Sequence, residues 1–340
     1  MTIDLPFHDV VSLVYDPRLN SLQTTRGILH ECGFRQIETT ADIEEFAGRL
    51  VENEPDLAIC EIGGQDGDAV EVVRRLRAGD LGGNPFLVVI MTSWRRTEAA
   101  VTRAMNAGAD DILVRPFSTA AVAQRIKACT LQRKDFIVTG QYVGPDRRSD
   151  ARGEGVSAPL FTPPNTLRAV VSGDADAKRA ELRKIETVSR GMERQQLKRL
   201  TLAVAVTAQL MMAKAKPTQG DYAELDRTAR ELRRRMRRSS SQEHKNLADI
   251  LVETTADLLD VQTRTERGLE MVLTMAKNIA VGGLGVDDGA FTAEVVKTAA
   301  ALSKRLAANL AKRTRQASID ARVARQSAAA KSAARANSAA

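Results

Sequence analysis

The chain has 340 residues, which is more than one hydrophobic core usually organises, so the sequence predicts at least two parts. Hydrophobic residues make up 43% and charged residues 27%, and no apolar run approaches the roughly 20 residues of a membrane-spanning helix. The first residues, MTIDLPFHD, lack the basic and apolar stretches of a secretory signal. We therefore expect a cytoplasmic protein without a membrane partner.

The three cysteines and three histidines are dispersed along the sequence and show no metal-ligand spacing. They are Cys32, Cys60, Cys129, His8, His30 and His244. Zinc sites and histidine-based nucleophilic catalysis need such side chains in clusters. The sequence also contains no glycine-rich phosphate loop and no kinase signature. It therefore predicts a protein that is not an enzyme and that needs no cofactor.

The formal net charge of +7 is divided unevenly along the chain. Residues 1–134 contain 15 Lys/Arg and 19 Asp/Glu, whereas residues 135–340 contain 35 Lys/Arg and 24 Asp/Glu. Such an asymmetry is typical of a protein whose basic part meets an anionic partner. Nucleic acid is therefore one candidate partner for the second part of the chain.

Short β-branched runs alternate with helical segments over the first 134 residues. The runs around residues 57 and 86 are almost continuously apolar, as required of strands that are buried on both faces of a parallel sheet. Between the runs, apolar residues recur at helical spacings of three and four. This rhythm predicts a doubly wound α/β domain with a five-stranded parallel sheet. Its strands are expected at 10–15, 35–40, 57–62, 86–93 and 111–116.

The composition changes after residue 134. Gly and Pro recur between residues 135 and 173, in GPDRR, GEG, APL and TPPN, which predicts a linker without regular elements. From 174 to about 325, Ala, Leu, Arg, Glu and Lys dominate, so this region is predicted to be α-helical. The Ala- and Arg-rich stretch 326–340 is predicted to be disordered. Helices are expected at 174–216, 220–237, 241–281 and 290–325.

The predicted helices carry apolar stripes that must be buried. In the third of them, Leu247, Leu251 and Leu258 mark one stripe, and Leu269 and Val272 continue it. Such stripes can pack against one another as a bundle or against a second copy of the chain as a homodimer. The sequence leaves both arrangements open.

Three segments at the ends of predicted strands carry a resemblance to a known family. PDLAICE (55–61), VVIMT (88–92) and GADDILVRPF (108–117) resemble the corresponding segments of bacterial response-regulator receiver domains. The resemblance covers residues 8–134 and implies a flavodoxin-like fold and a role in two-component, or phosphorelay, signal transduction. It also implies that partners bind to the fourth helix, the fifth strand and the fifth helix. The C-terminal region carries no such resemblance.

The resemblance also implies a phosphorylation site, whose residues are altered here. The family places two acidic residues after its first strand, where this chain has Tyr15 and Asp16, so one carboxylate is missing. Glu61 stands at the position of the phospho-accepting Asp, Arg115 stands at that of the Lys, and Thr92 keeps the family's hydroxyl. The extra methylene of Glu61 moves its carboxylate by roughly 1 Å or more, which spoils in-line attack on phosphorus. The site is therefore predicted to be degenerate.

We hypothesise that Glu61 pairs with Arg115 and, together with Thr92, holds the domain in one state without phosphorylation. Two alternatives remain open. One is a tolerated ion pair that encodes no signalling state, and the other is residual phosphorylation or Mg²⁺ binding, with Asp16 as the remaining metal ligand. Asp66 corresponds to the start of the third helix and is a poor substitute for the acceptor.

Three motifs of the second part have a weaker interpretation. The segment YVGPDRRSD (142–150) is interpreted as a solvated turn, with docking on an acidic surface as the alternative. His244 lies on a predicted helix, as the reactive histidine of a phosphotransfer domain does, but an exposed histidine is favoured. The run RELRRRMRRSSS (230–241) is interpreted as a solvated or protein-facing basic helix, with phosphate binding as the alternative. Its arginines are Arg230, Arg233, Arg234, Arg235, Arg237 and Arg238.

The sequence thus predicts a receiver-like domain (1–134), a linker (135–173) and an α-helical output region (174–325). The predicted function is that of an atypical, phosphorylation-independent response regulator that acts by binding a protein partner. The alternative is a nucleic-acid-associated regulator that uses its basic C-terminal helices. A binding curve measured against salt concentration would separate the two functions.

Overall fold

The computed structural model describes most of the chain, namely residues 5–63, 68–139, 142–147, 160–214, 216–238, 241–305 and 307–308. The chain divides into two compact units, residues 1–196 and residues 197–340. The predicted disordered tail, 326–340, lies outside the described residues, and so does Asp66.

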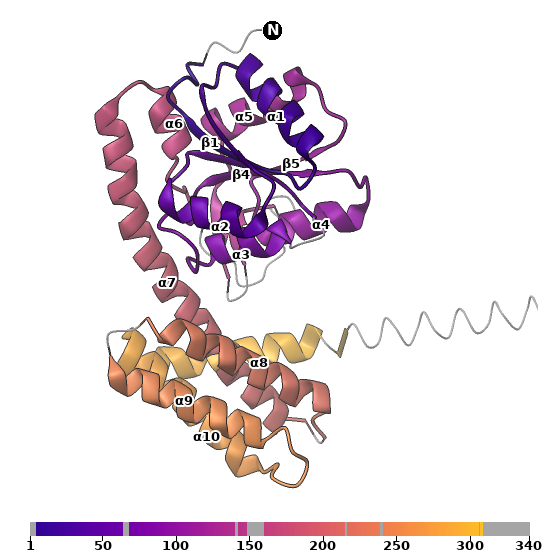
Figure 1. Cartoon of the computed structure of the whole chain (residues 1–340). Helices are drawn as coiled ribbons and strands as arrows, with labels where there is room; N and C mark the ends of the chain where they lie inside the picture. Colours follow the sequence, from indigo (N-terminus) through magenta and orange to yellow (C-terminus); the bar gives the residue numbers. More distant parts are fainter. Residues whose placement is uncertain are drawn as a thin grey trace, which may run out of the picture. The chain divides into compact units, whose positions relative to one another are not determined.

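The first unit is built on a five-stranded, all-parallel sheet with the strand order β2-β1-β3-β4-β5 (Figure 1). Its strands are β1 (Val11–Tyr15), β2 (Gln36–Thr40), β3 (Leu57–Glu61), β4 (Val88–Ser93) and β5 (Asp111–Val114). Helices α1 and α5 lie on one side of the sheet, and α2, α3 and α4 lie on the other (Figure 1). The helices are α1 (Leu19–Glu31), α2 (Ile43–Glu52), α3 (Ala69–Arg77), α4 (Glu98–Ala107) and α5 (Thr119–Leu131). The predicted doubly wound fold is confirmed.

Each face of the parallel sheet packs into its own hydrophobic core. Because side chains alternate between the two faces of a strand, Leu13 and Tyr15 of β1 enter one core and Val14 enters the other. In β3, Cys60 belongs to the first core and Ile59 to the second. Both cores exclude water from the sheet, so polar side chains gather where the strands end.

The segment that was predicted to be a linker, 135–173, instead forms regular elements in its described part. β6 (Phe136–Val138) pairs antiparallel with β7 (Val143–Pro145) and β8 (Leu160–Phe161) in a second, three-stranded sheet, and α6 (Thr166–Val171) follows. Strands of two or three residues between Gly and Pro have no detectable period, so the sequence pattern could not reveal them. β7 spans the VGP of YVGPDRR, which is therefore part of a sheet and not a solvated turn.

A buried arginine attaches this small sheet to the parallel-sheet domain. Arg77, at the end of α3, is 1% exposed and pairs with Asp110 at 2.9 Å. Arg133 contacts the same carboxylate at 2.7 Å and donates a hydrogen bond to the carbonyl of Pro164 at 2.9 Å. The guanidinium groups of Arg77 and Arg133 lie 5.3 and 4.9 Å from the ring centroid of Phe136. Desolvated cation–π contacts of this kind fix β6 beside the two arginines.

β7 packs backbone against backbone on the connection between α4 and β5. A Cβ atom added to Gly144 would lie 2.8 Å from the Cα atom of Gly108, closer than real Cβ atoms come. Gly108 ends α4 in the left-handed conformation, with φ of 92°, so this position also favours glycine. Arg147 donates a hydrogen bond to the carbonyl of Ala109 beside it. The GPDR segment (144–147) thus packs directly against the GADD segment (108–111).

Helix α7 (Ala175–Met212) joins this arrangement through apolar side chains of its first half. Ile185 and Met192 belong to one buried cluster with Phe86 and Phe136. Phe161 of β8 completes it, with edge-on ring contacts to Phe86 at 5.8 Å and to Phe136 at 6.2 Å between centroids. The small sheet therefore packs on one side against the parallel-sheet domain and on the other against α7.

The second unit consists of helices, as predicted, and its apolar stripes pack against one another within one chain. It contains the end of α7, followed by α8 (Gln219–Met236), α9 (Gln242–Asp257), α10 (Glu266–Asn278), the π-helical turn η2 (Ile279–Gly283) and a last helix over 288–305. Its most buried side chains include Val204, Leu225, Leu232, Leu251, Val272, Ile279 and Phe291. No helix within the described ranges is long and apolar enough to cross a membrane.

The third predicted helix, 241–281, is two helices, because polar groups end the first and begin the second. Arg264 donates hydrogen bonds to the carbonyls of Leu258 at 3.1 Å and Leu259 at 3.0 Å, which satisfies the end of α9. The hydroxyl of Thr265 accepts the backbone N–H of Gly268 at 3.0 Å and caps α10. The run TRT before a new apolar stripe is the signal that could have located this break.

We expect Gly144→Ala to lower the free energy of unfolding of the first unit by about 1–3 kcal/mol, because the new Cβ atom overpacks against the backbone of Gly108. Urea unfolding of the full chain measures the change. Gly191→Ala, on a helix with no atom within 4 Å of the new Cβ, is the matched control and should be neutral or slightly stabilising. Equal effects of the two substitutions would contradict the close packing of β7.

Candidate functional site

The predicted site residues meet at the carboxyl edge of the parallel sheet. Glu61 ends β3 and pairs in register with Thr92 of β4. Asp16 directly follows β1, and Arg115 directly follows β5. Because parallel strands end at the same edge, the topology alone brings these side chains together. All four are buried, with exposed fractions between 0% and 6%.

Arg115 is the centre of the site. Its Nη2 donates hydrogen bonds to Asp16 Oδ2 at 3.0 Å and to Thr25 Oγ1 at 2.9 Å, and its Nε lies 3.6 Å from Glu61 Oε2. Thr92 Oγ1 donates a hydrogen bond to the same Glu61 oxygen at 2.7 Å. One guanidinium group therefore lies between two buried carboxylates, and the threonine hydroxyl holds the second carboxylate in place.

Aromatic rings cover the guanidinium group. Its Cζ atom lies 4.6 Å from the ring centroid of Phe117 and 5.7 Å from that of Trp94. Arg18 contacts Trp94 as well, at 5.2 Å, and Trp94 is 44% exposed. A planar guanidinium group can stack on rings while its N–H groups bridge carboxylates, which a lysine ammonium cannot do. This geometry gives a physical reason for arginine at position 115.

The two carboxyl groups share this single buried cation. Burial raises the pKa of Asp16, although the N–H of Arg18 and the charge of Arg115 oppose the shift. Burial likewise raises the pKa of Glu61, and the neighbouring Asp16 raises it further, while the hydrogen bond from Thr92 opposes the shift. The shared cation therefore compensates the cost of burying both negative charges only in part.

The residues of the site do not fit Mg²⁺, which requires several oxygen ligands in octahedral geometry. Both oxygens of Asp16 already accept hydrogen bonds, Oδ1 from the N–H of Arg18 at 2.9 Å and Oδ2 from Arg115. The guanidinium group of Arg115 lies against the carboxylates that a metal ion would need. Among the described residues, no group of three or more potential metal-ligating side chains lies together.

Two contacts of the site were not predicted from the sequence. Thr25 on α1 is 0% exposed; its hydroxyl accepts from Arg115 and donates to the carbonyl of Ser21 at 2.9 Å. The backbone N–H of Arg18 donates a hydrogen bond to Asp16, and the guanidinium group of Arg18 stacks on the ring of Trp94. No spacing in the sequence identifies Thr25 as a site residue, because a lone threonine on an apolar helix face is normally a packing residue. The Asp-Pro-Arg turn after β1 was the available signal for Arg18.

The basic run lies at the end of α8, where three carboxylates compensate part of its charge. Four of its arginines form ion pairs: Arg230 with Asp226 at 2.7 Å, Arg233 with Asp249 at 3.8 Å, and Arg234 and Arg235 with Glu231 at 2.8 and 2.7 Å. The interpretation of this run as a solvated helix agrees with these pairs.

His244 lies at the start of α9, and its imidazole packs against the backbone of η2. A Cβ atom added to Gly283 would lie 3.1 Å from its Cδ2 atom, so the glycine leaves room for the ring. Ser241 caps the helix by accepting the N–H of His244. This histidine is partly buried against a backbone, whereas a phosphotransfer histidine must present its ring to a partner.

Residues 12–127 match the family model described as the response regulator receiver domain. The virulence transcriptional regulatory protein PhoP of Salmonella choleraesuis (strain SC-B67) is 30% identical over 108 residues, which are 32% of this chain and 46% of that relative. The transcriptional regulatory protein PrrA of Mycobacterium tuberculosis (strain ATCC 25618 / H37Rv) is 31% identical over 186 residues, 52% of this chain and 76% of that relative.

A crystal structure of a two-component response regulator from Clostridium difficile is 24% identical and covers 35% of this chain and 94% of its own, with a TM-score of 0.32. The chain spans less than half the length of the Salmonella relative. The family-model match lies in the first part of the chain.

We expect Arg115→Met to lower the free energy of unfolding by about 3–5 kcal/mol, because Asp16 and Glu61 would remain buried without their cation. Arg125→Met is the matched control, since Arg125 is 51% exposed and its pair with Asp111 should contribute less than about 1 kcal/mol. Urea unfolding of both variants measures the difference. Comparable losses would show that Arg115 is no more important than a surface arginine.

The raised pKa of Glu61 predicts the pH dependence of Glu61→Gln. The folded chain holds a proton on Glu61 up to a higher pH than the unfolded chain, whose Glu pKa is about 4.3. The stabilisation by the protonated form is therefore complete below that value and is lost as the pH rises through the folded pKa. Glutamine does not titrate and still accepts the hydrogen bond from Thr92.

Accordingly, the free energy of unfolding of Glu61→Gln relative to the wild type should increase as the pH rises from about 4 to about 7. Urea unfolding at several pH values gives this difference. A difference that decreased over this range would mean that the pKa of Glu61 is lowered in the folded chain.

Proposed function

This chain belongs to the response-regulator family, and from that premise we propose that it is an atypical regulator of bacterial two-component signalling whose receiver domain works without phosphorylation. The observation that carries the proposal is the position of Arg115, whose guanidinium group bridges Asp16 and lies against Glu61. An internal cation thus engages the carboxylates that the family's chemistry needs for a metal ion and a phosphoryl group. The receiver is set in one state by its own side chains.

The acceptor position supports the same proposal. A carboxylate that attacks phosphorus needs an exposed, unengaged oxygen in line with the leaving group. Glu61 is 6% exposed, and its Oε2 already accepts from Thr92 and faces Arg115. The glutamate bears one negative charge, compared with roughly −1.5 to −2 for a phosphoryl group, so it reproduces the phosphorylated state only in part.

We further propose that the protein signals by binding a protein partner at the surface formed by α4, β5 and α5. A polar pair supports this assignment, because Arg125 is 51% exposed on this surface and pairs with the half-buried Asp111. No catalytic step is assigned to the chain. The expected cytoplasmic location and the homodimer remain predictions, and so does the absence of enzymatic activity.

The nucleic-acid alternative gains no support from the run on α8, because four of its six arginines form ion pairs within the unit. The relatives PhoP and PrrA are transcriptional regulatory proteins by name. That name keeps nucleic acid among the candidate partners, but any contact must lie elsewhere than on the paired arginines.

Trp94 is the single tryptophan of the chain and contacts Arg115, so its fluorescence reports on the site in the full-length protein. We expect no saturable change when Mg²⁺ and then beryllofluoride, a phosphoryl mimic, are added. The control Arg115→Lys removes the stacked guanidinium group and should itself shift the emission of Trp94, which proves that the probe is sensitive. A saturable response of the wild type that disappears in Asp16→Ala would overturn phosphorylation independence.

A further inference from the structure

A cavity of about 700 Å³ lies beside the receiver site, at the carboxyl edge of the parallel sheet. Its wall includes Glu61 at the end of β3, Trp94 directly after β4 and Arg103 on α4. The volume lies within the roughly 300–1,000 Å³ of small-molecule sites in proteins, which combine apolar surface with a few polar groups. The cavity is therefore large enough for a ligand much bigger than a phosphoryl group.

The flat surface of this cavity is an exposed tryptophan. Trp94 is 44% exposed, although burial of an indole ring is strongly favourable. The guanidinium group of Arg18, which is also exposed, lies 5.2 Å from the centroid of the ring. Indole rings and guanidinium groups are both planar surfaces on which a base can stack. A ligand with an aromatic ring would thus cover apolar surface that the chain leaves open to solvent.

The charged side chains of the cavity favour an anion. Three arginines line it, namely Arg18, Arg95 and Arg103. The carboxylates in the wall are already engaged, because Asp68 pairs with Arg103 and Glu61 lies against Arg115. Within the described residues, by contrast, no ion pair is formed by the side chains of Arg18 and Arg95. The cavity therefore keeps a surplus of positive charge beside its aromatic ring.

We propose that this cavity binds a nucleotide, with the base stacked on Trp94 and Arg18 and the phosphate held by Arg95 and Arg103. Guanidinium groups bind phosphate through paired, charge-assisted hydrogen bonds, and a nucleoside monophosphate joins a flat ring to such a group. The inference rests on the proposed function, since a receiver that works without phosphorylation needs another input. A small ligand beside Glu61 and Trp94 supplies one.

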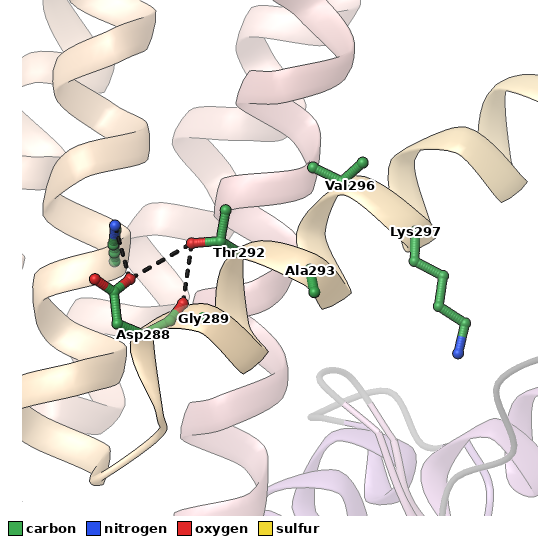
Figure 2. A pocket seen from close by; sticks show the side chains of 7 residues that line it. Asp288, Gly289, Thr292, Ala293, Val296 and Lys297 are labelled. Atoms are coloured by element: carbon green, nitrogen blue, oxygen red, sulfur yellow. Dashed lines mark hydrogen bonds and ion pairs between the residues drawn. The ribbon is translucent and has the colours of Figure 1, made fainter.

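A pocket on the second unit serves as an internal comparison (Figure 2). None of the described residues that line it is aromatic. One of its two lysines, Lys277, pairs with Asp288 at 2.7 Å, whereas Lys297 extends away from the other labelled side chains (Figure 2). This pocket offers a cation without a stacking surface, so we expect it not to bind nucleotides.

The test titrates the full chain with adenosine 5′-monophosphate and follows the emission of Trp94, the single tryptophan. Calorimetry of the same titration gives the dissociation constant. We expect saturable quenching by the nucleotide, and at least roughly tenfold weaker binding of adenosine and of inorganic phosphate, each of which lacks one half of the contacts. The other three ribonucleoside monophosphates show whether the base matters.

Two substitutions locate the ligand. Arg95→Gln should weaken binding at least roughly fivefold through the lost phosphate contact. The matched control is Arg96→Gln, because Arg96 is equally exposed and adjacent but does not line the cavity, and it should change binding by no more than a factor of about 2. Trp94→Leu, measured by calorimetry, should weaken binding at least roughly fivefold through the lost stacking. Lys297→Gln should have no effect.

Several results would overturn the proposal. One is that none of the four nucleotides binds with a dissociation constant below about 1 mM. Others are equal affinity for inorganic phosphate, equal losses in Arg95→Gln and Arg96→Gln, or tighter binding of a single-stranded oligonucleotide, which would assign the cavity to nucleic acid. A saturable response to Mg²⁺ and beryllofluoride would instead contradict the proposed function, so the two failures are distinguishable.

Discussion

The buried guanidinium group of Arg115 is the contact on which the receiver domain depends. It is 5% exposed, yet it lies between two carboxylates, a hydroxyl and two aromatic rings. Removing such a cation from water is costly, and its partners offset the cost only in part, since Nε has no hydrogen-bond partner among the described residues. Because Asp16, Glu61 and Thr25 come from three different elements, the carboxyl edge of the sheet can adopt few other arrangements.

A second buried charge centre lies at the other end of the same strand. Asp110 directly precedes β5 and holds Arg77 and Arg133, whereas Arg115 directly follows β5 and holds the site. A strand of four residues, at roughly 3.3 Å per residue, connects the two centres. Arg77 and Arg133 also lie against Phe136 of the small sheet, so the second centre joins β5 to β6 by direct contacts. Ile185 and Met192 of α7 pack in the same buried cluster as Phe136.

The sequence predicted the elements that have a regular apolar period, and it missed the short strands and isolated contacts that have none. Five strands and five helices, with apolar residues at fixed periods, identified the parallel sheet, and the resemblance to receiver domains at the strand ends identified Asp16, Glu61, Thr92 and Arg115. The three-stranded sheet escaped prediction because its strands have two or three residues and its stability comes from Arg77 and Phe136, which are 59 positions apart in the sequence. Thr25 was missed for the same reason, since only the tertiary fold shows that a buried hydroxyl faces a guanidinium group.

The second unit shows why the number of arginines in a sequence does not give the available charge. The run on α8 is the densest group of arginines in the chain, but Asp226, Glu231 and Asp249 lie one helical turn away or on the neighbouring helix. Their carboxylates reduce the field that a polyanion would meet, because paired charges attract counterions weakly. The last helix has fewer cations per turn, and within its described residues Lys297, Lys304 and Arg305 form no ion pair. The available charge of the chain is therefore set by where acidic residues are scarce as well as by where the arginines are most frequent.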